Sequence, residues 1–301
     1  MPELPEVETT TMGLKRTIVG LTIKDVWTDI NTRDKRQLGA VANPKYFKSF
    51  RKEVKNKKVL SVERRAKNIL IHLSGDKTIL IHMKMTGHLL YGRYELKKKK
   101  WLPVGRVGPL HDPFNRFIHV VFVFLNGKHL VLSDMRKFGK ITLLDTDVTH
   151  NSKHLKNIGP EPLDLKFTFE KFTKCLSASG ARKIKTVLMD QGVVAGIGNI
   201  YSDEILWHAS IHPERKVSKL KEKELKLILK ATKKLLAKGI NFGGDSMSDY
   251  RNIHGLPGKF QLHHQAYRRT GERCRKKNCK GKIVRKMIGG RSSHFCSMHQ
   301  K

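Results

Sequence analysis

Short apolar segments separated by turn residues constrain the fold of the first half of this chain more than any other feature. Segments rich in Val, Ile, Leu and Phe occupy residues 58–62, 68–73, 78–83, 87–92, 117–125, 129–134 and 140–144, and residues 21–28 alternate apolar with polar side chains. Turn residues such as Asn126-Gly127 divide them, and Asn-Gly between two strands is typical of a tight hairpin. Many short strands of this kind predict a two-sheet β-sandwich.

Helical patterns dominate the second half of the chain. Gly159-Pro160-Glu161-Pro162 marks the boundary, because two prolines exclude a regular element across it. Apolar spacing then predicts helices over 167–177, 183–190, 199–208 and 217–238, the last ending at a Gly239 cap.

Two flanking helices and one loop complete the expected α+β fold. Leu4, Val7, Leu14 and Ile18 form the apolar stripe of an N-terminal helix. Asn43 and Pro44 are typical of the start of a short basic helix that ends near Val54. The region from 94 to 113 contains Lys97-Lys98-Lys99-Lys100 with scattered Gly and Pro, so we expect a solvated loop there, with contact to phosphate as the alternative.

The charge of the chain indicates a polyanionic partner. There are 61 Lys and Arg against 26 Asp and Glu, a formal net charge of +35, which nucleic acid or an acidic membrane could neutralise. The longest apolar run, residues 117–125, is too short to span a bilayer, and no signal peptide opens the chain. We therefore expect a cytoplasmic protein with no membrane partner.

Cysteine spacing predicts a metal site at the C-terminal end. Cys274-x4-Cys279-x16-Cys296-x2-His299 provides two close pairs of ligands, the pattern of one structural, tetrahedral Zn²⁺ with no open position. His294 competes with His299 as the fourth ligand. Residues 280–287 and 289–295 could pair as a β-hairpin.

The first residues place a nucleophile beside a proton carrier. Cellular processing removes Met1 when Pro follows, which leaves the secondary amine of Pro2 next to Glu3. A terminal amine has a pKa of about 7.7–8.0, so an unprotonated fraction exists near neutral pH to attack an electrophilic carbon. The adduct of Pro2 with a sugar C1′ would be an iminium ion, which acidifies the neighbouring C2′ hydrogens.

The opening Met-Pro-Glu-Leu-Pro-Glu-Val-Glu-Thr resembles that of bacterial formamidopyrimidine-DNA glycosylases, within the wider group that includes endonuclease VIII. Residues 191–201, Gln-Gly-Val-Val-Ala-Gly-Ile-Gly-Asn-Ile-Tyr, resemble the family's helix-two-turns-helix segment, and Gly290-Arg291-Ser292-Ser293 resembles its zinc-finger tip. The resemblance runs nearly end to end. It implies a catalytic β-sandwich domain at 1–158, a helix-two-turns-helix domain at 159–263 and a zinc finger at 264–301.

The same resemblance implies roles for individual residues. Pro2, Glu3, Lys67 and Arg291 would be catalytic. Lys67 would support the first two near the phosphate and the departing base, and Arg291 would grip the phosphates beside the lesion. Five more residues would contact DNA. Met85 would fill the space left by the extruded nucleotide, Phe138 would act as a wedge, and Arg136 would face the orphan cytosine. Asn199 would bind a phosphate, and Tyr250 belongs to the loop at 243–250 that would cover the extruded base. The family pattern has Cys-x2-Cys in both pairs, so the longer first knuckle and His299 are departures.

The expected function is base-excision repair. The resemblance implies a DNA glycosylase and apurinic/apyrimidinic lyase that removes oxidised purines, chiefly 8-oxoguanine and formamidopyrimidines, from double-stranded DNA by β,δ-elimination. We expect a monomer that acts at the nucleoid of a bacterium and needs no redox or nucleotide cofactor. The alternatives are an endonuclease VIII-like glycosylase for oxidised pyrimidines, which Leu4 and the 243–250 loop disfavour, and a non-catalytic zinc-containing DNA-binding protein.

Overall fold

The computed structural model describes residues 1–301 and divides into two compact units. The first contains residues 1–156 together with 242–259, and the second contains 157–241 together with 260–301. The segment 242–259 therefore packs with the N-terminal half, although the chain reaches it only after the last long helix.

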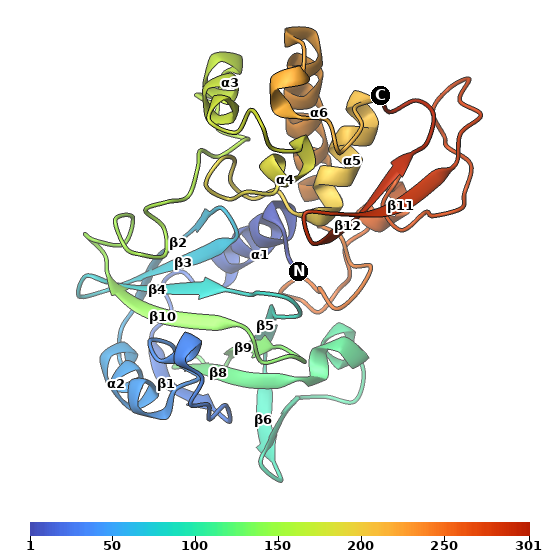
Figure 1. Cartoon of the computed structure of the whole chain (residues 1–301). Helices are drawn as coiled ribbons and strands as arrows, with labels where there is room; N and C mark the ends of the chain where they lie inside the picture. The colour runs from blue at the N-terminus through green and yellow to red at the C-terminus, as the bar shows by residue number, and fades with distance from the viewer. The chain divides into compact units, whose positions relative to one another are not determined.

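The first unit contains two four-stranded antiparallel sheets, with strand orders β1-β8-β9-β5 and β10-β4-β3-β2 (Figure 1). The strands are β1 (Ile23–Thr28), β2 (Val59–Arg65), β3 (Asn68–Leu73), β4 (Lys77–His82), β5 (His88–Gly92), β8 (Ile118–Phe124), β9 (His129–Ser133) and β10 (Lys140–Asp145). The predicted sandwich is confirmed. Each strand lies within two residues of its expected bounds except β2, which ends three residues later than expected.

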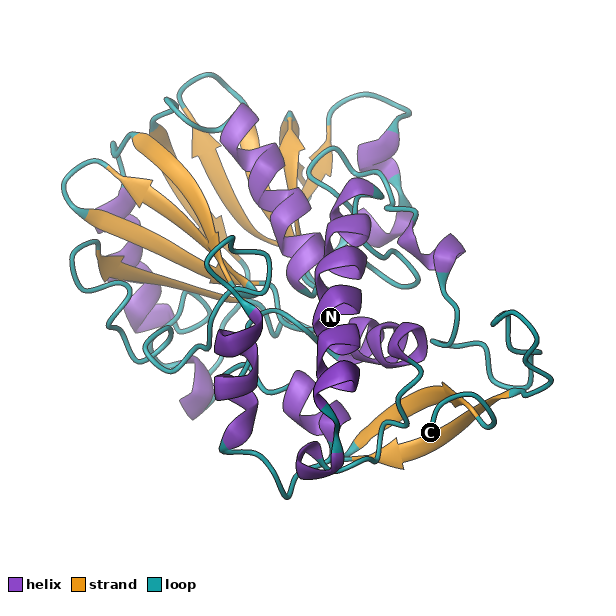
Figure 2. Cartoon of the chain, turned by 90° about the horizontal axis from the view of Figure 1, so that it is seen from above, coloured by secondary structure: helices purple, strands orange, loops and turns teal.

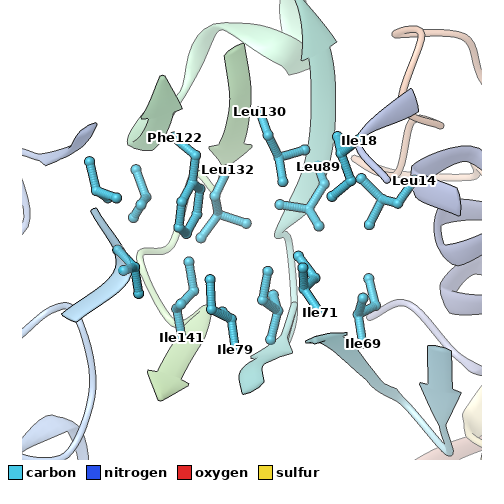
Figure 3. Close-up of a cluster of buried hydrophobic side chains, with 14 of the residues drawn as sticks. Leu14, Ile18, Ile69, Ile71, Ile79, Leu89, Phe122, Leu130, Leu132 and Ile141 are labelled. Atoms are coloured by element: carbon cyan, nitrogen blue, oxygen red, sulfur yellow. The ribbon is translucent and has the colours of Figure 1, made fainter. Parts of the chain in front are cut away.

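Apolar side chains fill the space between the two sheets. Figure 3 shows Leu89, Phe122 and Leu132 of one sheet facing Ile79 and Ile141 of the other, and all five are at most 2% exposed. Residues of alternating direction along each strand supply this layer.

Two helices flank the sandwich as expected. α1 (Leu4–Thr17) packs on β2 and β3, and Leu14 of the helix and its C-cap residue Ile18 enter the core (Figure 3). α2 (Pro44–Val54) begins at Asn43, whose side chain accepts a hydrogen bond from the N–H of Tyr46 at 3.0 Å. Asn43 is therefore a true cap.

The region from 94 to 113 differs from the expected loop. It contains a β-hairpin, β6 (Tyr94–Lys97) and β7 (Lys100–Pro103), followed by two short 3-10 turns. The hairpin forms because Tyr94 and Trp101 pack their rings against residues that are distant in the sequence. The run of lysines between them does not indicate this packing.

The second unit contains α3 (Phe169–Ser177), α4 (Ile184–Leu188), α5 (Asn199–Ala209), α6 (Glu222–Asn241) and the hairpin β11 (Ile283–Ile288) and β12 (Arg291–Cys296) (Figure 2). The predicted Gly239 cap is wrong. Helix α6 continues to Asn241, and a Cβ at position 239 would lie 2.3 Å from the Tyr201 hydroxyl oxygen, so glycine there allows close packing. In neither unit is any helix long and apolar enough to cross a membrane.

Candidate functional site

The N-terminus is fixed at the start of α1. Pro2 and Glu3 are both buried, and Glu3 is the N-cap residue of the helix. The Glu3 carboxylate accepts from the backbone N–H of Glu6, and the Glu6 carboxylate accepts from the N–H of Glu3 at 2.7 Å. This reciprocal capping box satisfies two donors of the first turn. The Pro2 nitrogen is consequently held in one place, as a nucleophile requires.

Glu6, in the first turn of α1, is a buried acid. Burial, reinforced by the charge of Glu3, raises the pKa of Glu6 to about 7. One carboxylate oxygen accepts from the backbone N–H of Asp245 at 2.7 Å. The only local signal was the Glu-x-x-Glu spacing of a capping box. Glu6 thus links the N-terminus to the loop at 243–250.

Tyr250 fixes the other end of that loop. Its side chain is 5% exposed, and its hydroxyl donates to the backbone carbonyl of Glu6 at 3.0 Å and lies 3.2 Å from Thr10 Oγ1. The structure therefore places Tyr250 against α1, and its contact with DNA stays a prediction.

Lys67 lies in the two-residue turn between β2 and β3 and is 5% exposed. The preceding Ala66 has a φ of +53°. Arg64 supports this turn, because its guanidinium pairs with Glu8 of α1 at 2.5 Å and donates to the Ala66 carbonyl at 3.1 Å. Helix α1 therefore carries both the N-terminus and the anchor of the Lys67 turn.

Positive charge gathers where the strands β3, β4 and β10 end on one side of the β10-β4-β3-β2 sheet. Asn68, His82 and Lys140 lie opposite one another across β3, β4 and β10. Burial, followed by the charges of Lys84 and Lys67, lowers the pKa of His82 to about 3. The imidazole therefore stays neutral, and the positive charge comes from Lys67, Lys84 and Lys140. The positive potential of these lysines attracts phosphate.

Asp134 organises the loops that carry the expected wedge residues. Its buried carboxylate accepts from the Thr86 hydroxyl, from the N–H of Arg136 at 3.3 Å and from the N–H of Gly139 at 2.7 Å. It therefore ties the loop at 83–87 to the loop at 134–139. No local pattern signals this role, because Thr86 and Asp134 are 48 residues apart.

The tied loops expose Arg136 and Phe138. The Arg136 guanidinium lies 4.5 Å from the centre of the Phe138 ring, whose residue is 43% exposed. Phe138, Met85 and Met1 line the same hollow of about 400 Å³, together with Lys84 and Lys140. The predicted wedge and filler thus meet at one hollow, which Met1, the residue before Pro2, also lines.

In the second unit, the turn before α5 is closed by Gln191. Its side-chain amide donates to the carbonyls of Met189 and Ile197 at 2.9 and 2.8 Å, and its oxygen accepts from the N–H of Gly196 at 2.9 Å. Asn199 follows as the first residue of α5. The glycine-rich turn is therefore rigid and presents Asn199 at a helix N-terminus.

Asn199 and Arg291 line one open hollow of about 700 Å³. Its other residues are mostly polar or basic: Tyr267, Arg268, Thr270, Arg285, Met287, Gly290, Ser292 and His294. The Asn199 Oδ1 atom is buried without a hydrogen-bond partner. Arg291 is exposed, directly after the Gly289-Gly290 turn of the β11–β12 hairpin. The structure thus brings together the two expected phosphate ligands of this unit.

A buried ion pair attaches this hairpin to the helices. Asp203 of α5 pairs with Lys185 of α4 at 2.5 Å, and both side chains are fully buried. Asp203 also accepts from the Ser293 hydroxyl at 2.9 Å and from the N–H of His294 at 2.8 Å. The orientation of the Arg291 turn therefore depends on one carboxylate.

Cys274, Cys279, Cys296 and His299 converge at the base of the hairpin, with their ligand atoms within 4.8 Å of one another. Backbone N–H groups of Lys276, Gly281 and Met298 donate to the three sulfurs at 3.3 to 3.5 Å. His299 points Nδ1 at the cluster and Nε2 at the Trp207 carbonyl, 3.1 Å away. Such outer bonds orient metal ligands.

His294 lies outside this cluster. Its Nδ1 atom is 3.2 Å from the Asp203 carboxylate, and its residue is 6% exposed. Of the two histidines left open by the sequence, only His299 joins the cysteines.

Two family models match the chain. Residues 1–141 match the formamidopyrimidine-DNA glycosylase N-terminal domain, and residues 158–251 match the formamidopyrimidine-DNA glycosylase H2TH domain. Formamidopyrimidine-DNA glycosylases of Pelotomaculum thermopropionicum and Heliobacterium modesticaldum are 38% and 35% identical to the chain over its full length, and the matches cover 99% and 100% of those proteins.

Solved structures of Lactococcus lactis Fpg are also similar to this chain. One is its complex with an abasic site containing DNA, with a TM-score of 0.83, 31% identity and 99% coverage of both chains. Another, of the wild-type protein with DNA containing N7-benzyl-Fapy-dG, has a TM-score of 0.82, 32% identity and complete coverage of both chains. Sequence, fold and site therefore agree that this chain belongs to the formamidopyrimidine-DNA glycosylase family.

Proposed function

We propose that this chain, a DNA glycosylase with abasic-site lyase activity by family, removes oxidised purines from duplex DNA with Pro2 as its nucleophile and Glu3 as its proton carrier. The observation that carries this assignment is the anchored terminus. Pro2 and Glu3 are buried at the start of α1, and the capping box with Glu6 holds them there.

The proposed course begins with the Pro2 amine. Its lone pair forms a bond to C1′ of the lesion nucleotide, while the bond from C1′ to the base breaks and its electron pair leaves with the base, which takes up the proton that the amine loses. Glu3 donates a proton to the ring oxygen, which opens the sugar and leaves an iminium ion. Loss of a C2′ proton then expels the 3′ phosphate, and a second elimination expels the 5′ phosphate. Lys67, buried beside the same helix, would hold the phosphate near this centre.

Borohydride trapping tests the nucleophile. Reduction of the iminium should join the processed protein covalently to a duplex that contains 8-oxoguanine, and peptide mapping should find the sugar remnant on Pro2. A matched preparation that retains Met1, made with methionine aminopeptidase inhibited, has an amide at Pro2 and should give no adduct. An adduct on an internal lysine, or equal trapping with Met1 retained, would overturn the assignment.

We also propose that the Cys274, Cys279, Cys296 and His299 cluster holds one structural Zn²⁺. Three thiolates and one imidazole suit zinc, and four protein ligands leave no open position for catalysis. Metal analysis should find one zinc per chain. Chelation should abolish DNA binding before the sandwich unfolds, and a metal-free protein that binds DNA normally would contradict this proposal.

Two groups of residues would contact DNA, one in each unit. Asn199 and Arg291, which share one hollow, would bind backbone phosphates. Met85, Phe138 and Arg136 would occupy the space left by an extruded nucleotide. We expect the protein to act as a monomer at the nucleoid of a bacterium. Comparing cleavage of 8-oxoguanine with that of thymine glycol separates this function from that of a pyrimidine-specific relative.

A further inference from the structure

The β6–β7 hairpin, which we call the lysine hairpin (residues 94–103), has no part in the mechanism above. Its strands pair only with each other, from Tyr94 opposite Pro103 to Lys97 opposite Lys100. It therefore projects as a separate two-stranded ribbon from the sandwich.

Aromatic packing fixes the lysine hairpin at its base, through Tyr94, and next to its tip, through Trp101, which follows Lys100. The Trp101 ring lies 6.1 Å from that of Trp27 in an edge-on arrangement and 5.1 Å from that of His129. Tyr94 is 5% exposed and belongs to a second apolar cluster with Leu90, Ile118, Val121 and Val131. Because its base is packed on the β1-β8-β9-β5 sheet, the ribbon presents its tip in a defined position.

The tip combines charge with an unfavourable backbone. Lys98 and Lys99 have φ angles of +48° and +65°, the left-handed conformation for which a two-residue hairpin normally uses Asn-Gly. A lysine in this region is disfavoured, because its Cβ approaches the following carbonyl oxygen, and four adjacent ammonium groups repel one another. Among the four, Lys97 has an acidic partner, Glu95, at 2.5 Å. The sequence keeps positive charge where turn chemistry and repulsion both oppose it, which indicates a binding role.

The surrounding surface is also basic. Between residues 93 and 106, six exposed cations, Arg93, Lys97 to Lys100 and Arg106, stand against one acid, Glu95. Leu96 and Leu102 are 50% and 44% exposed, but they lie on the strands and not at the tip. A membrane-binding element needs apolar side chains at its leading end, whereas a tip made only of lysines matches a phosphate backbone.

We propose that the tip of the lysine hairpin binds the phosphate backbone of duplex DNA, outside the lesion site and independently of sequence. This contact would raise affinity for undamaged DNA during the search and leave the chemical steps unchanged. The proposal depends on the proposed function only in taking DNA as the partner.

The test is a double substitution, Lys98→Asn with Lys99→Gly. It removes two charges and restores the favoured turn sequence, so the hairpin should fold at least as well as in the parent. The matched control, Lys48→Gln with Lys52→Gln, removes two exposed charges from α2 of the same unit. Affinity for an undamaged duplex is measured across a salt series, together with single-turnover excision at saturating enzyme.

For the hairpin variant, the slope of log affinity against log salt should decrease in magnitude by about 2, with an unchanged excision rate. The α2 control should retain the parent slope. An unchanged slope in the hairpin variant, or an equal loss in the control, would overturn the proposal. Loss of binding to anionic vesicles with DNA affinity intact would assign the hairpin to a membrane and would also overturn it. A parent that fails to excise 8-oxoguanine but shows the slope difference would refute the proposed function alone.

Discussion

In the first unit the acids Glu3 and Glu6 are 2% exposed, whereas in the second unit Arg285 and Arg291 stand exposed around an open hollow. Burial shifts proton affinity, as the raised pKa of Glu6 shows. Exposed cations attract phosphate through a field that salt screens. The difference suggests that proton transfer is confined to the buried acids of the first unit, whereas the hollow of the second unit serves phosphate binding alone.

The largest expected effect comes from Glu3→Gln, which keeps the side-chain shape but removes the proton carrier. Single-turnover base release should fall by about 10²–10⁴-fold, while affinity for the lesion duplex stays within a few-fold. The exposed Glu53→Gln on α2 serves as control. If affinity falls with the rate, chemistry and binding are not divided as described.

Asp203→Ala tests the anchor of the second unit. It leaves the Lys185 charge buried without its partner, so the unit should lose about 3–5 kcal/mol. Hydrogen exchange in α5 and β12 reports this unit alone. The double variant Asp203→Leu with Lys185→Met removes both charges and should lose less. Equal protection in the parent and Asp203→Ala would refute the role of the carboxylate.

The pH dependence of the first unit should reflect Glu6. Its pKa is raised from an ordinary 4.5 to about 7, so folding favours the protonated acid. The resulting stabilisation is complete below pH 4.5 and is lost as the pH rises to about 7, a change of up to about 3 kcal/mol. Urea denaturation at pH 5 and pH 8 measures it. Glu6→Gln should remove this pH dependence, and an identical profile in the variant would exclude Glu6 as its source.

The smallest expected effect is that of Arg291→Ala. Loss of one phosphate contact should reduce the salt slope of DNA affinity by about 1 and leave the saturated excision rate within tenfold. Lys286→Ala is the control on the same hairpin, because Lys286 is paired with Glu214 at 2.5 Å. A large loss of rate with unchanged slope would move Arg291 into the chemical step.

Local patterns predicted most of the fold. Apolar runs bounded by turns located β3 at its observed bounds, and Asn43-Pro44 located the start of α2, because these signals act between near neighbours. The errors arose where distant residues decide. Trp27 and His129 pack on Trp101 and make a hairpin of a lysine-rich segment, and Tyr201 occupies the space beside Gly239 inside α6.

The site divides in the same way. Motif spacing pointed to the residues that would touch a ligand, and the structure brings Cys274, Cys279, Cys296 and His299 together. Motif spacing did not identify the residues that hold the functional side chains in place. One of these is Glu6, which accepts a hydrogen bond from a residue 239 positions away. Supporting contacts of this kind leave no local pattern.

The bonds of Asp134 also matter for redesign. The hydrogen bonds among Thr86, Asp134 and Gly139 hold both ends of the loop at 134–139. Residues 135–138 can therefore be replaced together without removing the side chain that fixes the loop backbone. Libraries that vary positions 135–138 while keeping these three residues should yield folded proteins with altered preference for the base opposite the lesion.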